Sequence, residues 1–168
     1  FSMLKISIYV FGIDFLATTS ASDWLVWVAA FSILAASIVA LSKTNLKARL
    51  AYSTISQLGY IVLGAALASP LAASGAALHI ATHATGKITL FFCAGAIYVA
   101  HHLSDIRDMD GLGRRMPITF SAFALGALSI IGVPPLAGAW SKLMLMGGAM
   151  QSEFIIVIFV LAVSSLLN

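Results

Sequence analysis

The stretch His79-Ile-Ala-Thr-His-Ala-Thr-Gly-Lys87 decides how this chain folds, because it puts titratable side chains into the otherwise apolar segment 72–100. Side chains four residues apart lie on one face of an α-helix, so His79, His83 and Lys87 would form a stripe about 12 Å long. At the middle of a bilayer a lysine costs roughly 2.5 to 3.5 kcal/mol. We therefore predict a membrane helix with one functional polar face.

The composition is that of an all-α polytopic membrane protein. Of the 168 residues, 61% are hydrophobic and 9% are charged, whereas an ordinary soluble domain has about 25% charged residues. A span needs about 20 residues, so the length allows about five to six transmembrane helices and no soluble domain. The net charge of +3 is too small and too confined to loops to predict nucleic-acid binding.

Both ends of the chain lie inside apolar runs, at Phe1 without a starting methionine and at Asn168, which predicts a fragment of a longer chain. The single cysteine, Cys93, has no partner for a disulfide within the chain and is expected to be a buried, inert thiol.

Apolar runs and prolines divide the chain into helices. Pro117 suits the first turn of a helix, where its missing N–H is not needed. Pro134 and Pro135 remove two backbone donors, so the helix that begins at Pro117 is expected to break inside the membrane. In chain order we predict the end of a truncated helix (1–15), a turn (18–22), spans (24–41, 50–68, 72–100), a broken helix (117–131 and 138–150) and a last, incomplete span (154–167).

The basic residues alternate between the predicted loops. Loops 42–49 and 101–116 hold three lysines or arginines each, whereas 14–23, 69–71 and 148–153 hold none. By the positive-inside rule, the two basic loops face the cytoplasm.

Lys87 has two interpretations. It either snorkels to an interface or pairs statically with an acid, or it carries protons. Its central position disfavours snorkelling, and no complete predicted span contains an acidic residue. A buried lysine whose partner moves can take up and release a proton. We therefore favour proton transfer.

His79 and His83 allow three interpretations. Imidazoles exchange protons near neutral pH, so the pair could pass protons between Lys87 and one side of the membrane. The alternatives are hydrogen bonds that pack helices, or half of a zinc site. The zinc interpretation is weak because Ile80 stands where the HExxH pattern needs glutamate.

Lys142 follows the double proline. A broken helix exposes backbone groups, and such a break at membrane depth must face protein or a water-filled cavity. Lys142 is therefore predicted to line an ion path, the alternative being a lysine near the outer interface. Other polar side chains in the spans are assigned pore-lining or supporting positions: Ser56, Gln57, Thr82 and Ser141. We expect no catalytic Ser/His/Asp set, no metal and no cofactor.

Three ordered motifs resemble the antiporter-like subunits shared by respiratory complex I and the multisubunit Na⁺/H⁺ (Mrp) antiporters. They are NLKARLAYSTISQLGY at 45–60, HxxxHxxxK at 79–87 and PPLAGxxSK at 134–142. GKITLFFCAGAI at 86–97 is most similar to the D-type subunits of Mrp antiporters, whereas complex I subunits usually read closer to HAFFKALLFL. Asn45 and Ala48 depart from the family's usual D-x-K-R pattern.

The resemblance implies two inverted five-helix repeats, of which residues 24–168 would be the second and residues 1–15 the end of the first. Lys87 would be the central proton-carrying lysine, Lys142 the terminal ionisable residue, and His79 and His83 the link between hydrated stretches. The implied partners are other membrane subunits of the antiporter complex, the lipid bilayer, protons and Na⁺, in the bacterial plasma (inner) membrane.

Three hypotheses follow. The chain belongs to an Mrp-type cation/proton antiporter, to the proton-pumping arm of complex I or a membrane-bound hydrogenase, or to a structural subunit whose buried lysines only hold a helix bundle together. The first and third are not enzymes, and a translocase activity would belong to the complex I alternative alone.

Overall fold

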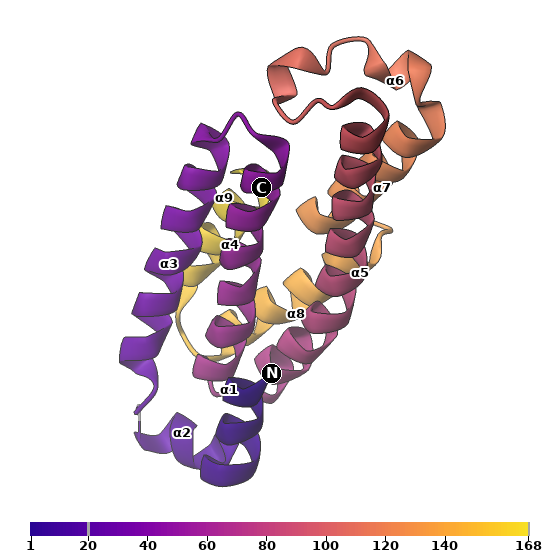
Figure 1. The fold of residues 1–168 in the computed structure, drawn as a ribbon. Helices are drawn as coiled ribbons and strands as arrows, with labels where there is room; N and C mark the ends of the chain where they lie inside the picture. Colours follow the sequence, from indigo (N-terminus) through magenta and orange to yellow (C-terminus); the bar gives the residue numbers. More distant parts are fainter. Residues whose placement is uncertain (20, 168) are drawn as a thin grey trace.

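The computed structural model describes residues 1–19 and 21–167, and the regular elements of that part of the chain are all helices (Figure 1). Residues 20 and 168, which belong to the predicted turn 18–22 and to the predicted repeat 24–168, lie outside it. The helices are α1 (Ser2–Lys5), the π-helix η1 (Ile6–Phe11), α2 (Ile13–Thr19), α3 (Asp23–Ser42), α4 (Leu46–Ala66), α5 (Pro70–His101), the 3₁₀-helix η2 (Ile106–Asp108), α6 (Leu112–Arg115), α7 (Pro117–Ile131), α8 (Ala137–Gln151) and α9 (Ile155–Leu167).

The all-α membrane fold is confirmed. Within the described residues, α3 and α5 are each long and apolar enough to cross a membrane, with mean hydropathies of 2.3 and 1.3. The predicted crossings also include α4, which is more polar, the pair α7 and α8, and the short apolar α9. α7 begins at Pro117 and ends at Ile131, the predicted bounds, and the break before α8 holds both adjacent prolines.

The predicted start of the second span at Leu50 is wrong, because α4 begins at Leu46. Asn45 is the N-cap, and its side-chain oxygen accepts a hydrogen bond of 3.1 Å from the backbone N–H of Ala48. This bond satisfies one of the amides that a helix start leaves unpaired. The cap places Lys47 and Arg49 in the helix instead of the predicted loop.

The N-terminal segment also differs from the predicted helix end. The two helical stretches Ser2–Phe11 and Ile13–Thr19 meet at an angle of 85°. Gly12 lies at the bend with φ 80°, a left-handed conformation that glycine adopts without steric cost. The helix continues through Asp14 to Thr19, so the predicted boundary near residue 15 is wrong.

The long helices bring the two basic loops to the same end of the molecule, drawn at the top of Figure 1, and the loops free of lysine and arginine to the other. The basic loops bind each other. Leu46 N–H donates to Ser104 O at 2.9 Å, and Ile106 N–H donates to Thr44 O at 3.0 Å. This pairing fixes the start of α4 against the linker between α5 and α7.

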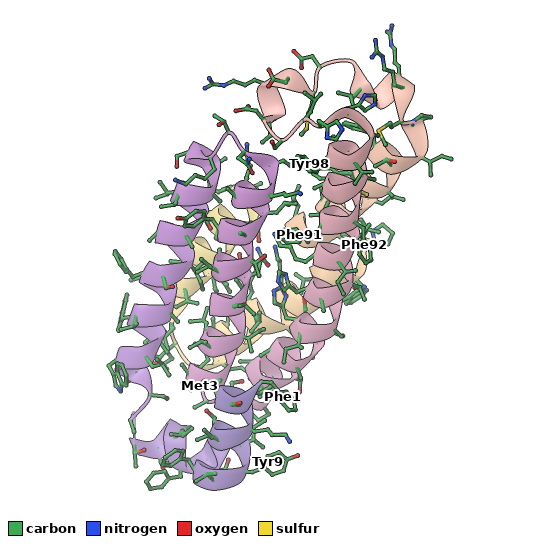
Figure 2. All side chains as sticks on the ribbon, viewed as in Figure 1. Phe1, Met3, Tyr9, Phe91, Phe92 and Tyr98 are labelled. Carbon is green, nitrogen blue, oxygen red and sulfur yellow. The ribbon has the colours of Figure 1, made fainter. Side chains whose placement is uncertain are left out.

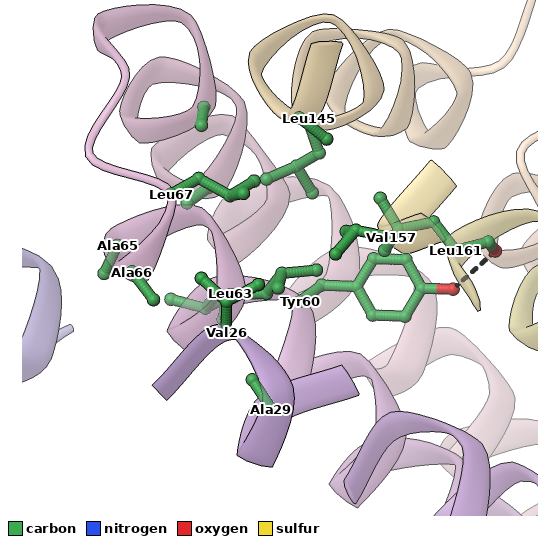
Figure 3. Packing of buried hydrophobic residues seen from close by; sticks show 14 of the residues in the cluster. Val26, Ala29, Tyr60, Leu63, Ala65, Ala66, Leu67, Leu145, Val157 and Leu161 are labelled. Atoms are coloured by element: carbon green, nitrogen blue, oxygen red, sulfur yellow. Dashed lines mark hydrogen bonds between the residues drawn. The ribbon is translucent and has the colours of Figure 1, made fainter. Parts of the chain in front are cut away.

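A hydrophobic core joins α3, α4, the first half of α5, the second half of α8 and α9. Figure 3 shows Val26, Leu63, Leu145 and Leu161 packed together, and none of these four side chains is exposed. Tyr60 lies among them and donates a hydrogen bond of 3.1 Å to the carbonyl oxygen of Leu161. The core therefore fixes the rotation of α4, and with it the direction of the polar side chains next to Tyr60.

Large apolar side chains also cover the outside of the bundle. Figure 2 shows Phe92 pointing outward from α5, and Phe92 is 75% exposed. Such an apolar exterior suits lipid or neighbouring membrane subunits.

Candidate functional site

The predicted stripe exists as one buried face of α5. His79, His83 and Lys87 are exposed by only 3%, 7% and 6%. The rings of His79 and His83 are stacked with centroids 5.7 Å apart, and the ring of Tyr60 of α4 is also stacked with His79, at 5.3 Å. α5 therefore presents its titratable side chains to α4.

Lys87 is bound by α4. Its ammonium donates to Ser53 Oγ at 2.8 Å and to Leu50 O at 3.1 Å. Two oxygens leave one of the three ammonium hydrogens for a further acceptor. All six acidic residues of the chain lie outside α4, α5, α7, α8 and α9, so these helices offer Lys87 no carboxylate for a static ion pair.

Lys142 is held by three oxygens. Its ammonium donates to Ile130 O at 2.6 Å, to Ile131 O at 3.1 Å and to Ser165 Oγ of α9 at 2.8 Å. The two carbonyls belong to the last turn of α7, where a helix leaves acceptors unpaired and its dipole favours a cation. With 4% exposure, Lys142 is buried at the break between α7 and α8.

The break itself depends on close backbone contact. Gly132 ends α7 with φ 92°. A Cβ atom on Gly138, in the first turn of α8, would overlap the carbonyl oxygen of Ser129. Glycine at 138 therefore lets α8 start directly against α7, which keeps Lys142 within reach of the α7 carbonyls.

Ser141 connects the broken helix to the histidines. Its hydroxyl donates to Gly138 O at 3.1 Å and lies 3.0 Å from His79 Nδ1. Because the hydroxyl proton is already used, we assign the proton of this second bond to Nδ1, which makes Nε2 of neutral His79 an acceptor. Thr82 Oγ1 lies 3.5 Å from the same Ser141 oxygen. The supporting positions predicted for Ser141 and Thr82 therefore fall beside the stripe.

Five buried polar atoms meet at one small cavity, here called the inner cavity. They are Gln57 Oε1 and Nε2, His79 Nε2, and His83 Nδ1 and Nε2, and none has a hydrogen-bond partner among the described residues. Gln57, His79 and His83 line the inner cavity together with Thr82, Ser129, Ile130 and Gly138. An unpaired buried polar group costs about 1 to 3 kcal/mol, and the inner cavity, as its side chains lie, has no room for a water molecule that could pair with these groups.

Ser56 lies away from the stripe on α5 and from the inner cavity. Its hydroxyl lies 2.9 Å from Ser37 Oγ of α3 and 3.0 Å from Ser164 Oγ of α9. Ser37 and Ser164 are 2.8 Å apart, so the three hydroxyls form a buried triangle. The structure does not bring Ser56 to Lys87 or to the histidines, because it points from α4 towards α3 and α9.

Three residues of the site, Ser53, Tyr60 and Ser165, are missing from the predicted set, although a signal for the first two is present in the sequence. Ser53, Gln57 and Tyr60 are spaced i, i+4 and i+7, which is one face of α4. Ser165 accepts from Lys142 and lies 3.3 Å from the Tyr60 hydroxyl. No local pattern marks Ser165, because only tertiary packing brings α9 to the broken helix.

A larger cavity, here called the loop cavity, runs from Lys87 to the basic loops. Its volume is about 400 Å³. Lys87 and Ser53 lie at its inner end, Arg49 and Asp110 near the loops, and mainly apolar side chains of α4, α5 and α7 form its walls. The remaining ammonium hydrogen of Lys87 thus has a route towards the surface that carries the basic loops.

The comparisons with known proteins agree with this arrangement. Residues 2–168 match the family model described as NADH:quinone oxidoreductase/Mrp antiporter, TM. The chain is 40% identical over 173 residues to NADH-quinone oxidoreductase subunit N of Desulforudis audaxviator, covering 99% of this chain and 34% of that protein. This chain thus spans about a third of that relative's length.

Solved structures have the same fold. A chain of the Mrp complex from Dietzia sp. DQ12-45-1b superposes with a TM-score of 0.86 and 29% identity, over 91% of this chain and 29% of that one. A chain of respiratory complex I from Thermus thermophilus superposes with a TM-score of 0.85 over 97% of this chain and 35% of that one, and at 23% identity it supports the fold alone. With the family match over nearly its whole length, the chain belongs to the membrane family shared by NADH:quinone oxidoreductase and the Mrp antiporters.

Proposed function

We propose that this chain forms a proton path in an antiporter-like membrane subunit, with Lys87, His83, His79 and Lys142 as the proton-transfer groups. The observation that carries the proposal is the position of Lys87. Its buried ammonium has two fixed acceptors in α4 and lies at the inner end of the loop cavity. A lysine held in this way can exchange its remaining proton with water without leaving its site.

Protons would move along α5 from Lys87 through His83 to His79, and then through Ser141 towards Lys142. The stacked rings and the bond from His79 to Ser141 support the order of these groups. The gap in the path is the inner cavity, where His83 has no hydrogen-bond partner among the described residues. The inner cavity has no room for water as its side chains lie. In this proposal they would move apart to admit water, which completes the connection, and close again to interrupt it.

We propose further that the subunit belongs to an Mrp-type complex that exchanges Na⁺ for protons, and that its basic loops face the cytoplasm of a bacterial cell. The sequence of residues 86–97 and the close superposition on an Mrp chain support this assignment. The identity with subunit N supports the alternative, a proton-pumping subunit of NADH:quinone oxidoreductase. Purifying the assembled complex would separate the two, because only the second requires quinone and iron–sulfur partners.

The test of proton transfer uses the full-length subunit in its assembled complex, reconstituted into liposomes. Lys87→Ala should abolish cation-coupled proton movement while the complex still assembles. Lys5→Ala is the control, because Lys5 is exposed near the N-terminus. Normal transport combined with defective assembly in Lys87→Ala would instead support the scaffolding hypothesis. Sodium-dependent proton movement by the unmodified complex would favour the antiporter over the redox-driven pump.

A further inference from the structure

The loop cavity contains one carboxylate among the described residues, that of Asp110. Asp110 is exposed and lies in the linker between η2 and α6. The other charged groups that line the cavity are Arg49 from α4 and Lys87 from α5, whereas α7 contributes only apolar side chains. Asp110 is therefore the acid that the fold places on the route between the basic loops and Lys87.

Two helices define the same length for this route. The lining of the cavity runs over ten residues from Ile97 to Lys87 on α5 and over ten from Phe120 to Ile130 on α7. Ten residues of helix correspond to about 15 Å. Asp110 and Lys87 lie at opposite ends of this length, so Asp110 is too far away to be a static ion-pair partner of the lysine.

The two neighbouring acidic residues, Asp105 and Asp108, are less suited than Asp110 to take up a proton for the loop cavity. The Asp105 carboxylate accepts a hydrogen bond of 3.0 Å from the backbone N–H of Arg107, and this bond, together with one from the Thr44 side chain, lowers the pKa of Asp105. Asp105 therefore holds a proton poorly. Asp108 is exposed two residues before Asp110, but it does not line the loop cavity.

We propose that Asp110 is the proton-uptake residue on the face that carries the basic loops, an inference that rests on the function proposed above. Its carboxylate takes one proton from water or buffer, becomes the carboxylic acid and passes that proton to water in the cavity. The water passes a proton to the neutral amine of Lys87, which becomes the ammonium. Each step moves one proton and no electrons, and Asp110 returns to the carboxylate.

The experiment compares Asp110→Asn with Asp108→Asn in the full-length subunit, assembled and reconstituted into liposomes. The two substitutions remove the same charge from the same basic loop, 101–116, so surface potential is matched. With little buffer outside, Asp110→Asn should slow proton uptake from the basic-loop face about tenfold, the lower end of the effect of charge on encounter rates. A membrane-impermeant buffer at high concentration should restore the rate, because buffer molecules then deliver protons to the cavity. Asp108→Asn and Asp110→Glu should behave like the unmodified protein.

Two results would overturn the inference about Asp110 without overturning the proposed function. One is equal uptake by Asp110→Asn and Asp108→Asn at low buffer. The other is slow uptake by Asp110→Asn at every buffer concentration, which would mean a structural role. In both cases Lys87→Ala would still abolish proton movement, so the proposed function would stand. If Lys87→Ala moved protons normally, the proposed function would fall, and Asp110 would lose its role with it.

Discussion

Lys87 donates a hydrogen bond of 2.8 Å to the hydroxyl of Ser53, and this contact joins α5 to α4 at the inner end of the loop cavity. Removing the hydroxyl would leave the buried ammonium with Leu50 O as its fixed acceptor. Ser53→Ala should therefore slow proton transfer and destabilise the protein by about 1 to 3 kcal/mol, the cost of an unpaired buried donor. Transport in liposomes and thermal unfolding of the purified complex measure the two effects. Ser74→Ala, an exposed position on α5, should change neither.

Replacing Gln57 should raise the stability of the protein and slow its proton transfer. Both polar atoms of its buried side chain lack partners among residues 1–19 and 21–167. Replacing Gln57 with methionine keeps the length of the side chain but removes the unpaired groups, so the protein should become more stable by about 1 kcal/mol or more. Proton transfer should slow, because the water that enters the inner cavity in the proposed path loses a hydrogen-bond partner. If the variant were more stable but transported protons at the normal rate, Gln57 would not be part of the proton path.

The Tyr60 hydroxyl links α4 to α9. Tyr60→Phe would keep the ring stacked on His79 but lose the hydroxyl that donates to Leu161 O. The expected loss is about 1 to 2 kcal/mol in the free energy of unfolding. The matched control is Tyr9→Phe, because Tyr9 is 80% exposed. Equal unfolding temperatures for the two variants would show that the α4–α9 bond contributes nothing.

Gly138 and Gly95 provide a matched pair of substitutions. Alanine at 138 would place its Cβ on the carbonyl of Ser129, whereas a Cβ at Gly95 would meet nothing within 4 Å. Gly138→Ala should destabilise by about 1 to 3 kcal/mol and impair transport, because α8 must shift away from α7. Gly95→Ala should be stabilising by up to about 1 kcal/mol, the helix preference of alanine over glycine. Thermal unfolding of the two purified variants compares the sites directly.

The pairing of the basic loops should weaken in acid. The backbone bond from Arg107, followed by the Thr44 bond, lowers the pKa of Asp105. A carboxyl group with a lowered pKa in the folded state stabilises that state above its unfolded pKa, and the contribution is lost as the pH falls. Hydrogen exchange at the amides of Leu46 and Ile106, corrected for intrinsic rates, should therefore increase below about pH 4. In Asp105→Asn this increase should disappear.

The bounds of several helices could be read from the sequence because their signals are local. Pro117 starts α7 and the residues from Gly132 onward end it, whatever the rest of the chain does. The start of α4 was misplaced because Asn45 caps it among basic residues that resemble a loop. Gly12 similarly bends an apolar run that periodicity alone predicts to be straight.

The sequence by itself determined that this is a membrane chain and that His79, His83 and Lys87 share a face, since four-residue spacing fixes their direction within one helix. Only the tertiary structure decided which groups meet that face. Ser53 and Gln57 turn towards α5, whereas Ser56 turns towards α3 and α9. The physical reason is that the partner of a buried polar group depends on how two helices are rotated and spaced. Packing of distant segments sets that geometry, and local periodicity does not specify it.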